Sequence, residues 1–326
     1  MLSINQIAQE REIINQSIRS FFHERAYIEV ETPLIVQSPG MEPNLVPFET
    51  RVIEPNKQSH LAALITSPEF SMKKLLGAGM EKIFTITKVF RNEESLGGNH
   101  NPEFTMLEWY EQGSDYQACM NETEAMIRAV AKKIAGYDWQ YAGQNVWKRI
   151  RVRDLFLEHV GLDLDIANVD SLKDACRLHE VHFVNDDTES DLFYRLFLSR
   201  VEPNLGKDPV FVYDYPIHQA SLSQLTNDGL YGQRFELYIN GLELCNGFTE
   251  LTKTNEQRTR FEAEAQERKK LGKTVHPIDE ELLRLLPSLK DPTFGNALGI
   301  DRLHMILTGR TRIQDVILFP ADQLFI

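Results

Sequence analysis

The sequence predicts an α+β domain in which an antiparallel sheet is flanked by helices. Two pairs of β-rich segments predict hairpins, whose strands are antiparallel, and amphipathic segments before and between them predict helices. With 326 residues, 42% of them hydrophobic, the chain can bury the core of one large domain or of two ordinary ones. It has no internal repeat, low-complexity segment or Ser/Gly/Pro-rich linker. We therefore expect one domain over residues 1–326, with a helical and chemically quiet insertion at about 112–200.

The first elements follow from hydrophobic spacing and from proline. Residues 9–26 carry isoleucine and phenylalanine at helical intervals, and the next segment, "YIEVETPLIV", alternates like a strand. Pro33 cannot donate to a ladder, so it restricts that strand to an edge or an interface. The segment "LAALITSPEFSMKKLLGAG" predicts a strand that runs into a helix, with Ser67 as N-cap and Pro68 at the first helical position.

Composition limits the classes of partner and the compartment. The chain has 35 Lys and Arg residues against 48 Asp and Glu, a net charge of −13, so no general field attracts nucleic acid or an anionic membrane, although a local basic patch still could. Its three cysteines lie far apart, which argues against a disulfide framework or a structural zinc site. The sequence contains no signal-peptide pattern and no membrane-length apolar segment. We expect a cytoplasmic protein with no membrane partner.

Chemically useful side chains gather in the stretch "FRNEESLGGNHNPEFTMLEWY", residues 90–110. Alternate residues of a strand share a face, so Arg91 points with Glu93, and Phe104 points with Glu108 and Tyr110. A cation, acids and a flat aromatic ring on facing strands would form two walls of a pocket. Taken singly, each residue also fits a plain structural role, as a surface ion pair, a core ring or a half-buried edge residue.

A second hairpin brings two acids to one face. Asn240-Gly241 predicts a type I′ turn, which pairs Ile239 with Leu242, Tyr238 with Glu243 and Leu237 with Leu244. Glu236 then lies on the face of Glu243, as its diagonal neighbour at about 7–8 Å between Cα atoms. Two such carboxylates can hold Mg²⁺, but they equally fit a solvated acid pair on an exposed sheet face.

These segments, in this order, resemble the class II aminoacyl-tRNA synthetases of the lysyl type. The stretch "FRNE…HNPEFTMLEWY" is similar to motif 2 of that family, "ALGIDRL" to motif 3, and the first helix with "EVETP" to the dimer-forming motif 1. The segment "GLELCNGFTEL" resembles the lysyl-specific segment upstream of motif 3. The resemblance covers nearly the whole chain. It implies the class II synthetase catalytic fold, ATP as a substrate, Mg²⁺ as a cofactor and a homodimer.

The resemblance also implies roles for the nucleotide-binding residues. Arg91 would bridge the α-phosphate of ATP and the amino-acid carboxylate, two anions that repel each other. Phe104 and Arg302 would stack on the two faces of adenine, and Arg302 with Arg91 would be catalytic. Further ATP contacts are implied for Asn92, Glu93, His100, Asn101, Glu243, Leu244 and Gly299, with Glu236 and Glu243 as Mg²⁺ ligands.

The amino-acid site implied by the resemblance is that of a lysine-like diamino acid. Glu108, Tyr110 and Glu250 would surround the ε-ammonium, because a desolvated cation needs more than one acceptor. Glu69 would bind the second ammonium, and Asn246 would lie near the substrate carboxylate. Ser67, Pro68 and Ala297 are implied close to the substrate backbone, where Ser67 and Ala297 replace smaller residues of the synthetases.

The motif 1 helix begins almost at Met1, so we expect no anticodon-binding OB-fold domain. This is typical of the truncated paralogues of lysyl-tRNA synthetase, which attach lysine, as (R)-β-lysine, to a lysine of translation elongation factor P. The resemblance therefore implies elongation factor P and lysine or β-lysine as partners, with tRNA an improbable acceptor. Two alternatives stay open: a stand-alone enzyme that passes a lysyl adenylate to tRNA or a small amine, and a non-catalytic regulatory paralogue.

Overall fold

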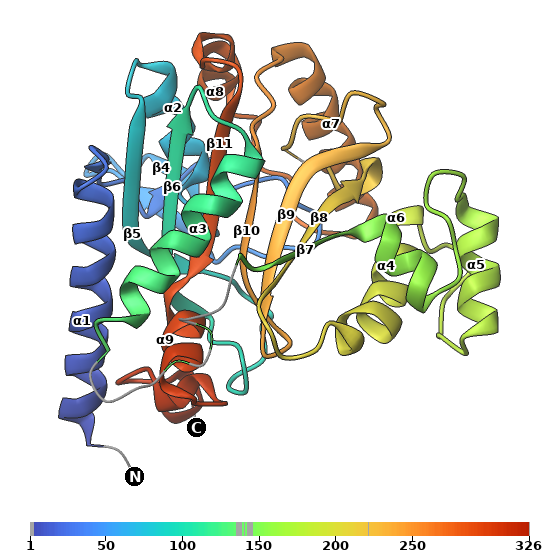
Figure 1. Ribbon diagram of the computed structural model, residues 1–326. Helices are drawn as coiled ribbons and strands as arrows, with labels where there is room; N and C mark the ends of the chain where they lie inside the picture. The colour runs from blue at the N-terminus through green and yellow to red at the C-terminus, as the bar shows by residue number, and fades with distance from the viewer. Residues whose placement is uncertain (1–2, 135–138, 140, 142–145, 221, 326) are drawn as a thin grey trace.

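The computed structural model describes residues 3–134, 139, 141, 146–220 and 222–325 (Figure 1). Within these residues the main sheet has eight strands. In spatial order they are β1 (Ile28–Glu29), β5 (Lys82–Phe90), β6 (Glu103–Gln112), β11 (Thr293–Gly299), β10 (Leu242–Thr249), β9 (Tyr231–Ile239), β8 (Val210–Pro216) and β7 (Lys148–Arg151). Only the outer pairs β1–β5 and β7–β8 are parallel. The predicted antiparallel sheet flanked by helices is confirmed.

One face of this sheet is covered by helices. α1 (Ile4–His23), α3 (Tyr116–Ala131) and α9 (Ile300–Thr308) pack against it and form the main core (Figure 1). Phe22 of α1 stacks on Phe84 of β5, with 4.9 Å between ring centroids. Because side chains alternate along a strand, the helix-covered face takes the apolar residues and leaves the polar residues of β6, β9 and β10 for the opposite face.

A second core lies beside the sheet. α4 (Val152–His159), α5 (Val169–Leu178) and α6 (Glu189–Leu196) pack together against β8, and Figure 1 shows them as a group at the β7–β8 edge. The range 112–200 also contains two elements of the main body. α3 belongs to the main core, and β7 adds a strand to the sheet that the sequence did not indicate.

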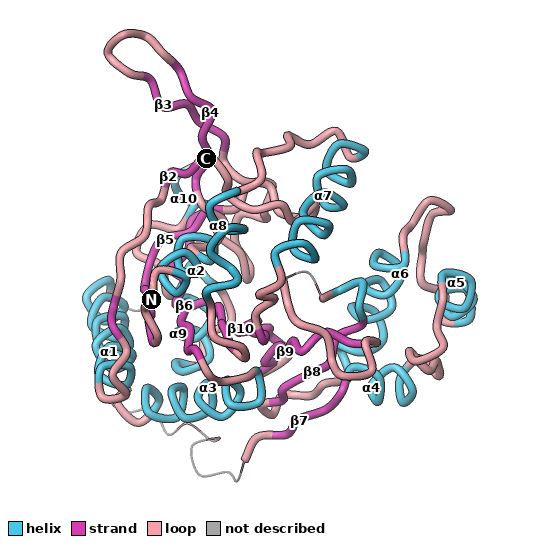
Figure 2. The backbone as a smooth tube through the Cα atoms, turned by 90° about the horizontal axis from the view of Figure 1, so that it is seen from above, coloured by secondary structure: helices cyan, strands magenta, loops and turns pink. Residues whose placement is uncertain are grey.

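The segment 27–36 differs from its prediction. It forms β1 and a separate short strand, β2 (Ile35–Val36), instead of one continuous strand, and Pro33 lies between the two. β2 belongs to a three-stranded sheet with β4 (Ser59–Leu64) and β3 (Glu49–Ile53). Figure 2 shows the β3–β4 hairpin projecting from the body of the molecule. Pro33 has no N–H to donate to a ladder, and it lies in the gap between the two strands.

The strand-to-helix prediction that follows is confirmed to within one residue. α2 spans Glu69–Gly77, with Pro68 at the N-cap position. The Oγ of Ser67, the predicted N-cap, still accepts the backbone N–H of Glu69 at 3.0 Å. The serine therefore satisfies one of the free donors at the start of α2, as a capping side chain does.

The two predicted hairpins are present, and one contains a bulge. β5 and β6 pair from Lys82–Glu111 to Phe90–Glu103. β9 and β10 pair as predicted at Ile239–Leu242 and Tyr238–Glu243. The predicted pair Leu237–Leu244 is wrong, because a β-bulge places Cys245 opposite Leu237. Leu244 is the extra residue, and it is buried in the main core with Cys245.

Candidate functional site

A cavity of about 780 Å³ lies on the face of the sheet that α1 and α3 leave open, and we call it the site cavity. Its wall includes residues of the β5–β6 hairpin, the β9–β10 hairpin, β11 and the first turn of α9. The sequence-predicted residues that line it are Ser67, Glu69, Arg91, His100, Asn101, Phe104, Glu236, Glu243, Leu244, Asn246, Ala297, Gly299 and Arg302. Residues more than 200 positions apart in the chain are thus brought together as the resemblance implied.

Arg91 is one of the arginines in the wall of the site cavity. Its guanidinium carbon lies 5.2 Å from the ring centroid of Phe104. Burial lowers the pKa of Arg91, while the charges of Glu243 and Glu94 act in the opposite direction. Among the described residues, its Nε is buried without a hydrogen-bond partner. A buried donor without a partner is costly, so this guanidinium is suited to an anionic ligand.

Arg302 reaches the site cavity from the first turn of α9. Its Nη1 donates to the backbone oxygen of Glu243 at 2.8 Å and lies 3.7 Å from the Glu243 carboxylate. Gly299, the N-cap residue of α9, lies beside it in the cavity wall. The guanidinium is thereby held at a fixed place on the wall.

Glu236 and Glu243 both line the site cavity, so the bulge leaves the two predicted metal ligands on one face. Burial, followed by the like charge of Glu236, raises the pKa of Glu243. Glu236 is already held by three donors: Arg234 at 2.6 Å, and the hydroxyls of Tyr215 and Tyr238 at 2.6 Å each. In the part of the chain that the structure describes, no three His, Cys, Asp or Glu side chains are grouped to hold a metal ion.

These two carboxylates suit Mg²⁺ better than a cation such as Ca²⁺, which takes most of its ligands from the protein. Mg²⁺ commonly takes one or two carboxylates and completes its shell with water and substrate phosphates. Glu243 faces the cavity and is destabilised as an anion by its neighbour Glu236. A divalent cation at this place would relieve that repulsion.

The predicted acids of the amino-acid site lie beneath the wall of the site cavity. Glu108 is 1% exposed and accepts the hydroxyls of Ser67 at 2.5 Å and of Tyr110 at 2.9 Å. Burial raises the pKa of Glu108 to about 8, and the like charge of Glu69 adds to the effect. Glu250 is fully buried in the same region. Glu108, Tyr110 and Glu250 do not line the empty cavity, although their near neighbours Ser67 and Glu69 do.

A lysine that the sequence reasoning missed lies among these acids. The Nζ of Lys73, in α2, is 2.5 Å from a carboxylate oxygen of Glu69 and 2.5 Å from one of Glu250. Burial lowers the pKa of Lys73, but the charges of Glu250 and Glu69 outweigh it and raise the value. An internal ammonium therefore occupies the place between two carboxylates that were expected to bind substrate ammonium groups.

Some predicted residues are not brought to the cavity. Asn92, Glu93 and Pro68 do not line it, and Glu93 is exposed with a φ of 59°. Its neighbour Glu94 lines the cavity and accepts from His100 at 2.8 Å. The predicted strand alternation failed here because β5 ends at Phe90, so the loop and not the pleat sets the direction of each side chain.

Gly295 makes room for the buried acids. A Cβ at this position would lie 2.3 Å from an oxygen of Glu250 and 2.3 Å from a ring carbon of Tyr110. Gly295 pairs with Tyr110 across the β11–β6 ladder. The sequence carried a signal for this position, because a glycine inside a strand often marks the close approach of another group.

Asn101 has a structural role besides its place in the cavity wall. Its side-chain oxygen accepts the backbone N–H of Ala321 at 2.9 Å, at the start of α10 (Ala321–Leu324). Beyond it lies a groove of about 1060 Å³, lined by α1, β5 and the C-terminal segment, which we call the terminal groove. Asn101 and Asp301 line both hollows, so they form a shared wall.

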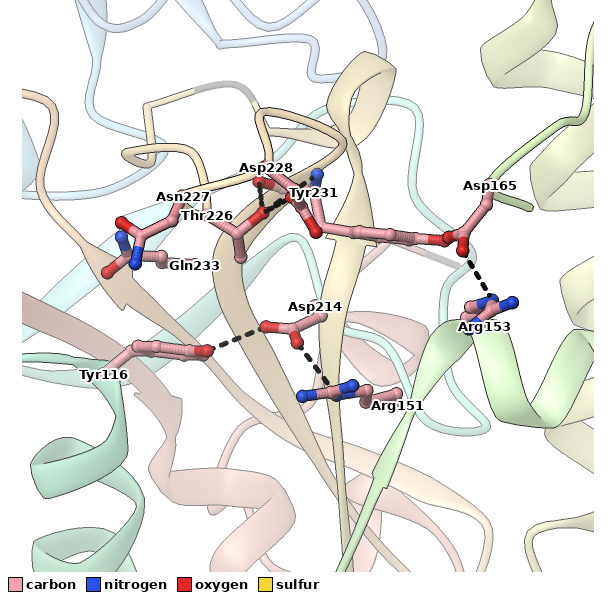
Figure 3. A pocket seen from close by; sticks show the side chains of 10 residues that line it. All are labelled: Tyr116, Arg151, Arg153, Asp165, Asp214, Thr226, Asn227, Asp228, Tyr231 and Gln233. Atoms are coloured by element: carbon pink, nitrogen blue, oxygen red, sulfur yellow. Dashed lines mark hydrogen bonds and ion pairs between the residues drawn. The ribbon is translucent and has the colours of Figure 1, made fainter.

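A further, smaller cavity of about 340 Å³ opens near the start of α3 (Figure 3). Its charged residues are bonded to one another: Asp214 accepts from Tyr116 at 2.8 Å and pairs with Arg151, and Asp165 accepts from Tyr231. Because these groups satisfy each other, the cavity offers little to a charged ligand.

This fold and this constellation of residues define a class of protein. The family model of the class II tRNA synthetases (D, K and N) matches residues 2–323, and the chain belongs to this family. It is similar to proteins named elongation factor P–(R)-β-lysine ligase: 39% identical to that of Enterobacter sp. (strain 638), 40% to that of Salmonella typhi and 39% to that of Yersinia enterocolitica. Each match covers 320 residues, 96% of this chain and 94% of the relative. Among the helices that the structure describes, none has the length and apolar character needed to span a bilayer.

Proposed function

We propose that this protein uses ATP to activate (R)-β-lysine, or α-lysine, as an adenylate and transfers it to a lysine side chain of translation elongation factor P. The names of the relatives support this assignment, as does membership of the class II family. A cytoplasmic location follows from the proposed partner, because elongation factor P acts in translation.

One observation carries the proposal: the wall of a single cavity holds both cations suited to an anion and acids suited to an ammonium group. Arg91, with its unpartnered Nε, and Arg302 line this cavity, and so do Ser67 and Glu69, which contact the buried Glu108 and, through Lys73, Glu250. A diamino acid carries a carboxylate at one end and ammonium groups along its length. It would fit this cavity with each charge near its complement.

The chemistry follows from these charges. The carboxylate oxygen of the amino acid attacks the α-phosphorus of ATP, and the bond to pyrophosphate breaks. Arg91 would bridge the two anions and stabilise the charge that builds up between them. The ε-amine of the acceptor lysine then attacks the carbonyl carbon of the mixed anhydride and loses a proton, and AMP leaves as the amide forms. Phe104 and Arg302 would hold the adenine ring.

We assign Mg²⁺ binding to Glu243 and Glu236. The ion would neutralise phosphate charge that the two arginines leave uncompensated. Glu243 is the better placed of the two, because Glu236 already accepts from Arg234, Tyr215 and Tyr238.

The preference for (R)-β-lysine is assigned to the two positions where the chain departs from the synthetases. Ala297 pairs with Asn246 and Glu108 across neighbouring strands, and the Ser67 hydroxyl bonds Glu108. Each change adds about one heavy atom near the substrate backbone, worth about 1–3 kcal/mol of discrimination. Equal rates of ATP–pyrophosphate exchange with the two isomers would contradict this preference.

The acceptor is tested by a competition assay. The protein is incubated with ATP, radiolabelled lysine isomers, tRNA and elongation factor P together. We expect label and the corresponding mass increase on a lysine of elongation factor P. Label found mainly on the 3′ end of tRNA would restore the aminoacyl-tRNA synthetase alternative. An absence of adenylate formation would favour the non-catalytic paralogue, which the presence of Arg91, Arg302, Glu236 and Glu243 argues against.

We also propose a homodimer built on the terminal groove. The groove is lined by residues of α1, which carries the motif 1 resemblance, and by the C-terminal segment. Phe319 and Phe325 are 75% and 70% exposed there. Large exposed rings beside a groove are typical of a surface that another chain covers.

A further inference from the structure

We infer that Glu42 is a substrate-binding residue. Its carboxylate accepts a hydrogen bond from the ammonium group that lies nearest to the reacting carboxylate of the diamino acid. The inference rests on the proposed function and adds a residue to the site that neither motif resemblance nor strand alternation indicated. Glu42 lies in the loop before β3 and lines the site cavity. Within the described residues, its carboxylate makes no hydrogen bond or ion pair with another side chain.

Three other carboxylates that line the site cavity have a basic partner. Glu69 is paired with Lys73, Glu94 with His100, and Glu236 with Arg234. Lys73 also pairs with Glu250, so the internal ammonium engages two of the three carboxylates on which the amino-acid site was expected to depend. Glu42, by contrast, lines the site cavity and has no ion pair with another described side chain, so its carboxylate is open to an incoming ammonium group.

Glu42 lines the same cavity as Arg91 and Glu69. Burial raises its pKa and the charge of Glu69 adds to this, whereas the charges of Arg91 and Lys73 oppose it. Glu42 is thus within electrostatic range of Arg91, the proposed carboxylate-binding and phosphate-binding residue, and of Glu69. We assign the amine closest to the reacting carboxylate to Glu42, and the distal amine to Glu108 and Glu250.

The loop that carries Glu42 is held in place from several sides. Met41 is buried in a core with Leu222 and Phe261. Arg268, near the end of α7 (Thr254–Lys270), donates to the backbone oxygens of Glu42 at 2.9 Å and of Leu45 at 3.0 Å. Such anchoring fixes the loop that carries the carboxylate, as a binding residue requires.

Gly40 and Lys273 complete this arrangement. Lys273 donates to the oxygen of Pro43 at 2.7 Å. Gly40 has a φ of 138°, and a Cβ there would lie 2.5 Å from a carboxylate oxygen of Glu42. The absence of a side chain at Gly40 leaves the space in which the Glu42 carboxylate lies.

The charges of the pocket agree with this role. Four carboxylates, those of Glu42, Glu69, Glu108 and Glu250, influence one another at the amino-acid end, against the single ammonium of Lys73. A substrate with two ammonium groups would favour the ionised form of these acids, because a nearby opposite charge lowers the pKa of a carboxyl group. An amino acid with one ammonium group would do so for fewer of them.

The test compares two ligands that differ in this amine. ATP–pyrophosphate exchange is measured with (R)-β-lysine and with α-lysine, and 6-aminohexanoate, which lacks the amine nearest to the carboxylate, is measured as a competitive inhibitor. We expect Glu42→Gln to lower kcat/KM for the preferred lysine isomer roughly 10- to 100-fold, mainly through KM, as for loss of a hydrogen bond between charged groups. The inhibition constant of 6-aminohexanoate should stay within about twofold of its original value, since it has no group to lose.

Glu49→Gln is the matched control. Glu49, like Glu42, acts electrostatically on Arg268, but it is exposed and lies outside the site cavity. It should leave both constants unchanged. Equal losses for lysine and 6-aminohexanoate in Glu42→Gln, or no loss for lysine, would overturn the assignment. If the unaltered protein exchanges with no diamino acid, the proposed function fails, and the role of Glu42 fails with it.

Discussion

The ammonium of Lys73 lies 2.5 Å from the carboxylate of Glu250, and both side chains are closed off from solvent. Breaking a buried ion pair from one side leaves an uncompensated charge, which costs about 3–5 kcal/mol. We expect Lys73→Met to lower the free energy of unfolding by about this amount at pH 8, as measured by urea denaturation.

Lys74→Met is the natural control for this change. Lys74 pairs with Asp279 and Glu281 at the partly exposed surface, where an ion pair contributes about 0–1 kcal/mol. If Lys73→Met and Lys74→Met lowered the free energy of unfolding equally, the buried ion pair of Lys73 would contribute no more to stability than the surface ion pair.

Gly295→Ala should destabilise the protein, because its Cβ would collide with Glu250 and Tyr110. Overpacking of this kind costs about 1–3 kcal/mol. Gly299→Ala is the comparison, since the nearest atoms that a Cβ there would meet belong to Arg302, at 3.8 Å or more, so it brings no overpacking cost. Thermal denaturation of the two variants distinguishes them, and similar melting temperatures would contradict the close approach at Gly295.

Glu108 should make the protein less stable as pH rises. Its pKa is about 8 in the folded protein and 4.5 ordinarily, so between these values the folded state holds a proton that the unfolded state has released. The contribution of this proton is complete below pH 4.5 and is lost as pH rises toward 8.

The measurement is the free energy of unfolding at pH 5, 6 and 7 for the unaltered protein and for Glu108→Gln. We expect the unaltered protein to lose up to about 1.4 kcal/mol per pH unit more than the variant, which has no proton to lose at this position. Parallel curves would mean that Glu108 titrates normally.

Arg91→Ala should reduce ATP–pyrophosphate exchange by several orders of magnitude, because it removes several kcal/mol of charge stabilisation from the transition state. Arg51→Ala removes an exposed arginine of β3 that donates to Ser59, and should leave exchange unchanged. Exchange that survives the loss of Arg91 would exclude it from the catalytic machinery.

The double substitution Phe319→Asp and Phe325→Asp should convert the proposed homodimer into monomers, because it would bury two charges against an apolar surface. Light scattering at micromolar concentration measures the change. Leu178→Asp is the control, because Leu178 is equally exposed, at 76%, but lies on α5, away from the terminal groove. A monomeric unaltered protein would contradict the proposal directly.

Local patterns predicted much of this fold. The Asn240-Gly241 turn set the β9–β10 register correctly as far as Tyr238–Glu243. The bulge at Leu244 was beyond such reasoning, because its position depends on packing in the main core and not on the turn. Pro33 likewise marked an interruption that the alternation around it concealed.

The site was predictable where a motif carried it and not elsewhere. Arg91, Phe104 and Arg302 line one cavity as expected. Lys73 gave no signal, because a lysine on an amphipathic helix is ordinarily a surface residue, and only tertiary packing reveals it as 1% exposed. Glu42 lies in a loop, where neither helical nor strand periodicity predicts the direction of a side chain.

Asn101 and Asp301 separate the site cavity from the terminal groove, and each lines both of them. If a ligand in one hollow shifts these two residues, thermodynamic reciprocity requires that the ligands of the two hollows alter each other's affinity by the same factor. If the second copy of the chain docks in the groove, the affinity for ATP would depend on protein concentration. Nucleotide binding would then be a property of the assembly and not of the single chain.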